Sequence, residues 1–156
     1  MVRTFSIHSE EIAKFLGTAF LNADQMAVVS PWVSDITVRF PDSDRISDQR
    51  LRFSETVQIL DVDLEVFVDP NQNHHNRRKP TSLLPRISDH VSIHEVDGLH
   101  AKAIVTDRVL YQGSANMTYN GLNVNIELCD IRENEYGDVD QFLEHQLGIS
   151  PDRQSI

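Results

Sequence analysis

The residues of this chain most suited to chemistry are a histidine and a lysine two positions apart, His100 and Lys102. Residues two apart on a β-strand project from the same face, so the imidazole and the ammonium group would lie side by side. Burying both without a local partner is costly, whereas an exposed pair suits an anion. The lysine would neutralise the anion, and the histidine would attack it or transfer a proton. The pair therefore predicts a site for a phosphate-like group.

A second group of polar residues follows closely, namely Gly113, Ser114 and Asn116. Glycine allows close approach of the backbone, and the hydroxyl and amide groups can donate hydrogen bonds to an oxyanion. A His-x-Lys pair alone usually marks only a solvated strand edge. Its combination with Asp107 and Gly-Ser-x-Asn is much rarer by chance, and we interpret it as a functional site.

The combined pattern resembles the signature of the phospholipase D superfamily, H-x-K-x4-D, commonly followed by G-S-x-N. The matching residues are His100, Lys102, Asp107, Gly113, Ser114 and Asn116. The expected order of helices and strands is compatible with that family over about residues 5–147, and the detailed match covers 99–128. The stretch between Asp107 and Gly113 is one residue shorter than is common in the family, which predicts a tighter hairpin.

The resemblance implies a metal-independent phosphodiesterase that needs no cofactor and forms a covalent phosphohistidine. By this resemblance His100 is the nucleophile, and Lys102, Asn116 and Ser114 hold the non-bridging oxygens. Glu127, in the strand after the motif, would orient the histidine. Asp107 would fix the geometry of the hairpin or lysine, or would be a simple turn residue.

Members of this family use two copies of the motif, and this chain contains one. The other histidines lack a lysine two residues later; they are His8, His74, His75, His90, His94 and His145. The resemblance therefore implies a homodimer in which each subunit contributes one copy.

Hydrophobic periodicity predicts an α/β domain over residues 1–147, with a mixed sheet sandwiched between helices, and a flexible tail over 148–156. The expected helices cover about 9–21, 48–60, 82–88 and 139–147. The expected strands cover about 25–33, 64–68, 91–96, 100–106, 109–112 and 124–131. No internal repeat or linker divides the chain.

The formal net charge of −10 argues against a protein that coats nucleic acid, although a nuclease with a locally positive cleft remains compatible with it. The chain has one basic cluster, Arg77, Arg78 and Lys79, which is either a solvated loop or a contact to a phosphate backbone. A nuclease acting on DNA or RNA is the leading hypothesis, because small single-motif members of the superfamily resemble bacterial endonucleases.

Other features of the sequence bear on the location of the protein and on its core rather than on its chemistry. No apolar run approaches the ~20 residues of a membrane helix and no secretory signal is evident, so we expect a cytoplasmic protein without membrane insertion. The single cysteine, Cys129, is expected to be a buried thiol. His90 and His94 are too far apart on a strand to share a metal ion, and Trp32 is expected in the core rather than as a stacking platform.

Two alternatives use the same residues differently. One is a lipid or small-molecule phosphodiesterase or transferase, against which we see no amphipathic, aromatic-rich segment. The other is a catalytically silent module that captures nucleic acid for a defence or restriction assembly. Cleavage of candidate substrates in the presence of a chelator would discriminate among the three.

Overall fold

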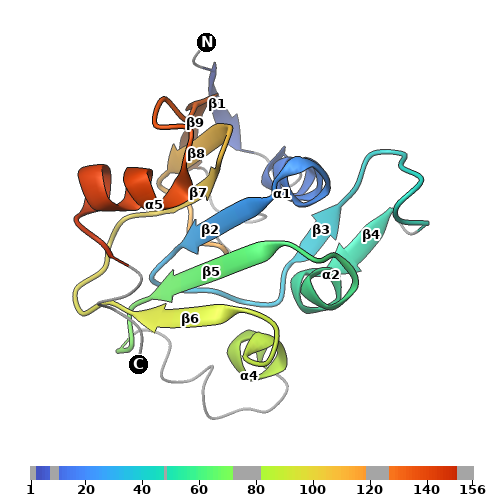
Figure 1. Cartoon of the computed structure of the whole chain (residues 1–156), viewed down its shortest axis with the longest axis horizontal. Helices are drawn as coiled ribbons and strands as arrows, with labels where there is room; N and C mark the ends of the chain where they lie inside the picture. Colours follow the sequence, from blue (N-terminus) through green and yellow to red (C-terminus); the bar gives the residue numbers. More distant parts are fainter. Residues whose placement is uncertain (1–2, 8–10, 48, 72–81, 119–126, 151–156) are drawn as a thin grey trace.

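The computed structural model describes residues 3–7, 11–47, 49–71, 82–118 and 127–150, and all structural statements concern these residues. Within them, seven strands form one sheet in the order β1-β9-β8-β7-β2-β5-β6 (Figure 1). Their bounds are β1 Arg3–Ile7, β2 Gln25–Val29, β5 Asp63–Val68, β6 Ser92–Glu95, β7 Ala103–Thr106, β8 Val109–Gly113 and β9 Glu127–Glu133. Strands β2, β5 and β6 are parallel, and the remaining neighbours pair antiparallel.

Helices cover both faces of this mixed sheet, as the sequence predicts. One face carries α1 (Glu11–Asn22), α2 (Phe53–Ile59) and α4 (Leu83–Ile87), and the other carries α5 (Val139–Phe142) with the π-helical turn η2 (Leu143–Leu147) (Figure 1). The alternation of side chains along β2 produces the two cores, because Val28 belongs to the first hydrophobic cluster and Ala27 and Val29 to the second.

The predicted helix over 48–60 is wrong in its first part. Residues Arg50–Arg52 form a strand, β4, that pairs with β3 (Thr37–Arg39) in a small separate sheet, and α2 begins only at Phe53. Leu51 is buried between exposed Arg50 and Arg52, which is the two-residue period of a strand.

The predicted strand over 100–106 begins later than expected, at Ala103. Ala103 pairs with Val29, the last residue of β2, and Pro31 soon follows. Proline has no N–H with which to continue a ladder, and His100 and Lys102 lie just before the strand, outside regular secondary structure.

The two ends of the described chain also differ from expectation. Strand β1, which the sequence did not indicate, pairs antiparallel with β9 along the sheet edge. At the other end, Gly148 adopts φ 65° and ends η2, and Ile149 is buried in the second cluster. The packed chain therefore extends two residues past the predicted boundary at 147, and residues 151–156 lie outside the described part.

None of the described helices is both long and apolar enough to cross a membrane. Cys129 is buried in β9, as predicted.

Candidate active site

The candidate site lies where the parallel strands end and β7 begins. Val29 at the carboxyl end of β2 pairs with Ala103, which directly follows Lys102. In Figure 1 this is the side to which the arrowheads of β2, β5 and β6 point. Ligands of α/β sheets are commonly bound at the carboxyl ends of strands.

His100 and Lys102 are brought together at this edge. His100 is exposed and Lys102 is half-buried. The Lys102 ammonium donates to the His100 carbonyl oxygen over 2.9 Å, and its Nζ lies 3.5 Å from His100 Nδ1. The first contact fixes the lysine on the backbone, so a positive charge stays beside the exposed imidazole.

Gly113 joins the two halves of the motif through the backbone. Its N–H donates to the Lys102 carbonyl over 3.3 Å, next to its ladder pair with Cys129. A Cβ at position 113 would lie 2.6 Å from the Leu128 carbonyl oxygen and 2.8 Å from Cys129 Cβ. The glycine is therefore needed for the close approach of β8 to β9.

Ser114 is exposed, but β9 engages its polar groups. The Ser114 N–H donates to the Leu128 carbonyl over 3.0 Å, and Ser114 Oγ accepts from the Leu128 N–H over 3.2 Å. To bind substrate, the hydroxyl would have to share or exchange these contacts.

Asn116 lies on a segment fixed by the chain after β2. Met117 forms an isolated parallel bridge with Val33, accepts from the Ser34 N–H over 2.9 Å, and donates from its own N–H to Ser30 Oγ over 3.0 Å. The side chain of Asn116 is half-buried, and its Oδ1 is buried without a hydrogen-bond partner among the described residues. An amide oxygen of this kind can accept a hydrogen bond from a donor group of a ligand.

Asp107 is not brought together with His100 and Lys102, and its place at the β7–β8 hairpin is compatible with the hairpin or turn role expected of it. It follows β7 at the opposite end from Lys102. Five residues of extended chain correspond to about 16 Å. The hairpin is held by Thr106, whose Oγ1 accepts from the N–H groups of Arg108 (3.2 Å) and Val109 (2.9 Å).

The structure describes only the backbone of Glu127, and the basic cluster of the predicted site is outside the described residues. Glu127 is the first residue of β9, next to the Leu128 that contacts Ser114, and its backbone pairs with Ile7. Its side chain lies outside the described part. Arg77, Arg78 and Lys79 also lie outside the described residues.

Trp32 is the residue that the sequence interpretation misplaced. It is 42% exposed rather than a core residue, and it follows β2 at the edge that holds His100. Its position after the carboxyl end of a buried strand, in Ser30-Pro31-Trp32, is the signal that could have indicated a ligand-facing role.

His90 and His94 lie in different surroundings. His94 is buried, stacks on Phe67 with ring centroids 4.7 Å apart, and has Nε2 3.5 Å from Glu65 Oε1, whereas His90 is exposed. The described residues contain no group of three or more His, Cys, Asp or Glu side chains that could hold a metal ion.

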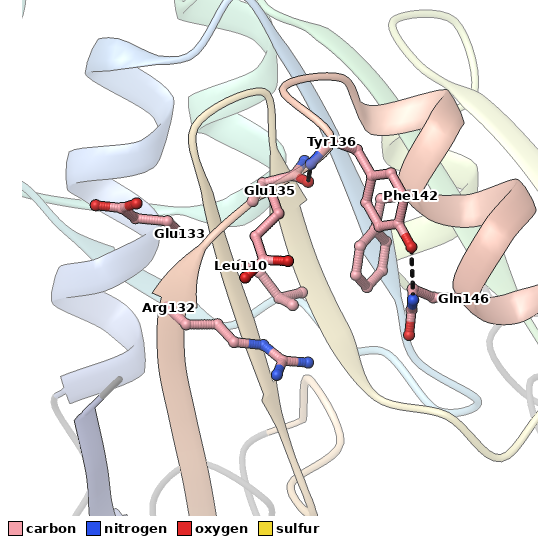
Figure 2. Close-up of a pocket in the computed structure, with 8 residues that line it drawn as sticks. Leu110, Arg132, Glu133, Glu135, Tyr136, Phe142 and Gln146 are labelled. Atoms are coloured by element: carbon pink, nitrogen blue, oxygen red, sulfur yellow. Dashed lines mark hydrogen bonds between the residues drawn. The ribbon is translucent and has the colours of Figure 1, made fainter. Parts of the chain in front are cut away.

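A separate hollow of about 140 Å³ lies far from this chemistry, against α5 and η2 (Figure 2). Arg132, Tyr136 and Gln146 are among its lining residues, and Gln146 Nε2 donates to the Tyr136 hydroxyl over 2.7 Å. Arg132 pairs with Leu110, toward the end of the β8–β9 ladder opposite Gly113. This hollow therefore lies at the opposite end of the β8–β9 ladder from the candidate site.

The similarity of this chain to known proteins is found in its fold. No protein-family model and no curated protein matches the sequence. Among solved structures, the phospholipase D family member Nuc from Salmonella typhimurium superposes with a TM-score of 0.63 over 100% of this chain and 96% of its own, at 14% identity. The chain has a phospholipase D-type fold.

Two other structures share this phospholipase D-type fold. NucT from Helicobacter pylori has a TM-score of 0.60 at 10% identity, with coverage of 99% of this chain and 96% of its own. Phosphatidylserine synthase from Haemophilus influenzae has a TM-score of 0.55 at 12% identity, and the match covers 99% of this chain but 39% of that enzyme.

Proposed function

We propose that this protein is a metal-independent phosphodiesterase that hydrolyses nucleic acid, DNA or RNA, at a site shared by two copies of the chain. The observation that carries the proposal is the position of the Lys102 ammonium, 2.9 Å from the carbonyl oxygen and 3.5 Å from Nδ1 of His100. The pair lies at the strand ends of a phospholipase D-type fold, and its imidazole is exposed to an incoming phosphodiester.

In the first step, Nε2 of His100 attacks phosphorus and forms a P–N bond while the bond to the leaving oxygen breaks. The leaving oxygen takes a proton from the partner's His100. In the second step, water attacks phosphorus, the P–N bond breaks, and the partner's His100 accepts the proton that water loses. Dividing the displacement in this way requires one histidine that starts neutral and one that starts with a proton to give.

The contact to Lys102 bears on that division of roles. An ammonium group only donates, so a hydrogen bond from Lys102 to Nδ1 requires the neutral imidazole to carry its proton on Nε2. The histidine that protonates the leaving oxygen must instead start as an imidazolium, which donates from both ring nitrogens and so gives up this contact with Lys102. A nucleophilic histidine needs a proton on Nδ1 and an acceptor there, for which Glu127 is the candidate.

The electrostatic part of the mechanism falls to Lys102 and Asn116. The ammonium group stabilises the negative charge of the non-bridging oxygens in the transition state. A divalent metal ion has this role in other phosphodiesterases. Asn116 would donate from its Nδ2 amide group to one of those oxygens. Ser114 assists only if its hydroxyl can exchange its contacts with Leu128.

Nucleic acid is favoured over lipid by the described surface. The large apolar side chains exposed there are four, namely Trp32, Ile59, Leu128 and Tyr136. They come from separate elements, and none of the helices in the described part of the chain exposes a row of large apolar side chains of the kind that binds a bilayer. The basic run Arg77, Arg78 and Lys79 would add phosphate contacts in an otherwise acidic chain.

The proposal is tested by incubating the purified protein with single- and double-stranded DNA, RNA and phosphatidylcholine vesicles in excess EDTA. His100→Ala is the inactive variant, and His90→Ala is its matched control because His90 is also exposed but has no lysine two residues later. We expect cleavage of a nucleic acid by the wild type and by His90→Ala, and none by His100→Ala.

The alternatives give different results. Cleavage that disappears in EDTA would refute the metal-free mechanism, and cleavage of phosphatidylcholine alone would favour the lipid enzyme. Binding of nucleic acid without turnover would favour the silent binding module. A catalytically active strict monomer would exclude the shared site.

A further inference from the structure

Trp32 lies in lateral register with Asn116 of the candidate site. Val33 and Met117 form a parallel bridge, and the Ser34 N–H donates to the Met117 carbonyl over 2.9 Å. In parallel pairing, the residues that precede two bridged partners also lie across from each other. Neighbouring strands are about 4.8 Å apart, so the backbones of Trp32 and Asn116 lie at about that separation.

The burial of the bridged residues indicates where their neighbours face. Val33 is 1% exposed and Met117 is 3% exposed, so both point into the core. Successive side chains of extended chain point to opposite sides. Trp32 and Asn116 therefore leave the backbone on the side opposite Val33 and Met117, where Trp32 is 42% exposed and Asn116 is half-buried with its Oδ1 covered.

The backbone around Trp32 is held firmly, which makes it a defined platform. Ser30 Oγ donates to the Trp32 carbonyl over 2.6 Å and accepts from the Met117 N–H over 3.0 Å. One hydroxyl thus ties the tryptophan loop to the segment that carries Asn116. Pro31 further restricts the backbone immediately before Trp32.

We propose that Trp32 stacks on an unpaired base next to the phosphate bound at His100, so that the substrate is single-stranded nucleic acid. This inference rests on the proposed function and specifies its substrate class. An indole stacks on a base only when that base face is free, and in a duplex both faces are covered by neighbouring pairs. Stacking tolerates any base, so the contact selects strandedness rather than sequence.

The charge of the chain supports the same inference. A formal net charge of −10 weakens the general attraction to phosphates that supplies most non-specific binding of nucleic acids. An acidic protein therefore depends more on contacts that do not involve phosphate. The exposed indole beside the site can provide such a contact.

The test uses Trp32 itself as the reporter, because it is the only tryptophan in the chain. His100→Ala protein is titrated with a single-stranded oligonucleotide, an abasic strand of the same length, and a duplex, in EDTA. We expect stacking to quench the fluorescence with the base-bearing single strand and to leave it nearly unchanged with the other two. Equal quenching by the abasic strand, or no quenching at saturation, overturns the inference.

Substitution then separates stacking from folding. In the same His100→Ala background, Trp32→Ala should weaken binding of the base-bearing strand roughly tenfold or more, as loss of a base–aromatic stack does. It should leave abasic-strand binding unchanged, and Trp32→Phe should retain part of the affinity. Ile59→Ala is the control, because Ile59 is a similarly exposed apolar residue (55%) at the end of α2. A loss that is equal for abasic and base-bearing strands contradicts stacking.

The outcomes distinguish this inference from the proposed function. Quenching by the single strand without cleavage of any nucleic acid by the wild type refutes the hydrolase and supports the stacking contact. Cleavage that is insensitive to Trp32→Ala refutes stacking and leaves the hydrolase intact. Dissociation of a dimer by Trp32→Ala, or quenching by phosphatidylcholine vesicles alone, would assign the indole to a subunit interface or a lipid and also refute the inference.

Discussion

Replacing Gly113 with alanine is expected to force β8 and β9 apart beside the candidate site. The new Cβ would lie 2.6 Å from the Leu128 carbonyl oxygen, 2.8 Å from Cys129 Cβ and 3.0 Å from Cys129 Cα. Backbone atoms dominate this contact, so a side-chain rotation cannot relieve it. The strands must separate by roughly 0.5 Å or the ladder must break locally.

The expected loss of stability can be worked out from this clash. Overpacking against rigid surroundings costs about 2–3 kcal/mol, the upper part of the usual range. The lower chain entropy of the unfolded alanine variant offsets about 0.4–1 kcal/mol of that cost. The free energy of unfolding should therefore fall by about 1–2.6 kcal/mol, which lowers Tm by about 2–10 °C in a domain of this size.

Thermal unfolding followed by circular dichroism measures this change, and amide exchange locates it. Exchange should accelerate at Ser114 and Leu128, whose backbone groups bond across the two strands. Gly98→Ala is the comparison, because a Cβ there meets nothing within 4 Å and only its φ of +73° is strained. A Tm within about 1 °C of the wild type, with unchanged protection at Leu128, would refute the steric account of Gly113.

Three shorter predictions concern the dimer, the fold and the hairpin. If the site is shared, exchanging equal amounts of wild-type and His100→Ala subunits should reduce cleavage to about one quarter of the all-wild-type rate at the same total concentration, whereas independent sites would retain about one half. Asp35→Ala should lower the free energy of unfolding by about 1–3 kcal/mol in urea titrations, because Asp35 accepts from the N–H and Oγ of Ser54 (2.9 and 2.7 Å) and pairs with Arg86 at 3.3 Å. Asp107→Ala should change the cleavage rate far less than His100→Ala does, and a comparable loss in both would show that the distance along β7 has been misjudged.

Elements with a strong local pattern could be predicted from the sequence. The apolar residues of α1 recur at helical spacing. Strands β2 and β5 are mainly apolar, and the cores on the two faces of the sheet bury them from both sides. Strands β1, β3 and β4 were missed because each is short and depends on a partner that local sequence does not reveal. Arg50–Arg52 alternates like a strand, but three residues are too few to outweigh the helical pattern that follows.

The same distinction applies to the candidate site. His100 and Lys102 are close in the sequence, so their association could be predicted even though they precede the strand. The place of Trp32 beside Asn116 depends on a bridge between segments far apart in the chain, which no local spacing encodes. Asp107 belongs to the same motif but lies at the opposite end of β7 from Lys102, a separation that follows from the length of the strand.

The pairing of β1 with β9 has a consequence for synthesis of the protein. Strand β1 lies at the sheet edge, and its ladder partner is a strand made from Glu127 onward. Contacts of such long sequence separation form late, because the loop that they close is long. A nascent chain that ends before β9 therefore carries an unpaired β1, which is exposed to aggregation until translation reaches its partner. Strand β1 is thus made long before the strand that secures it.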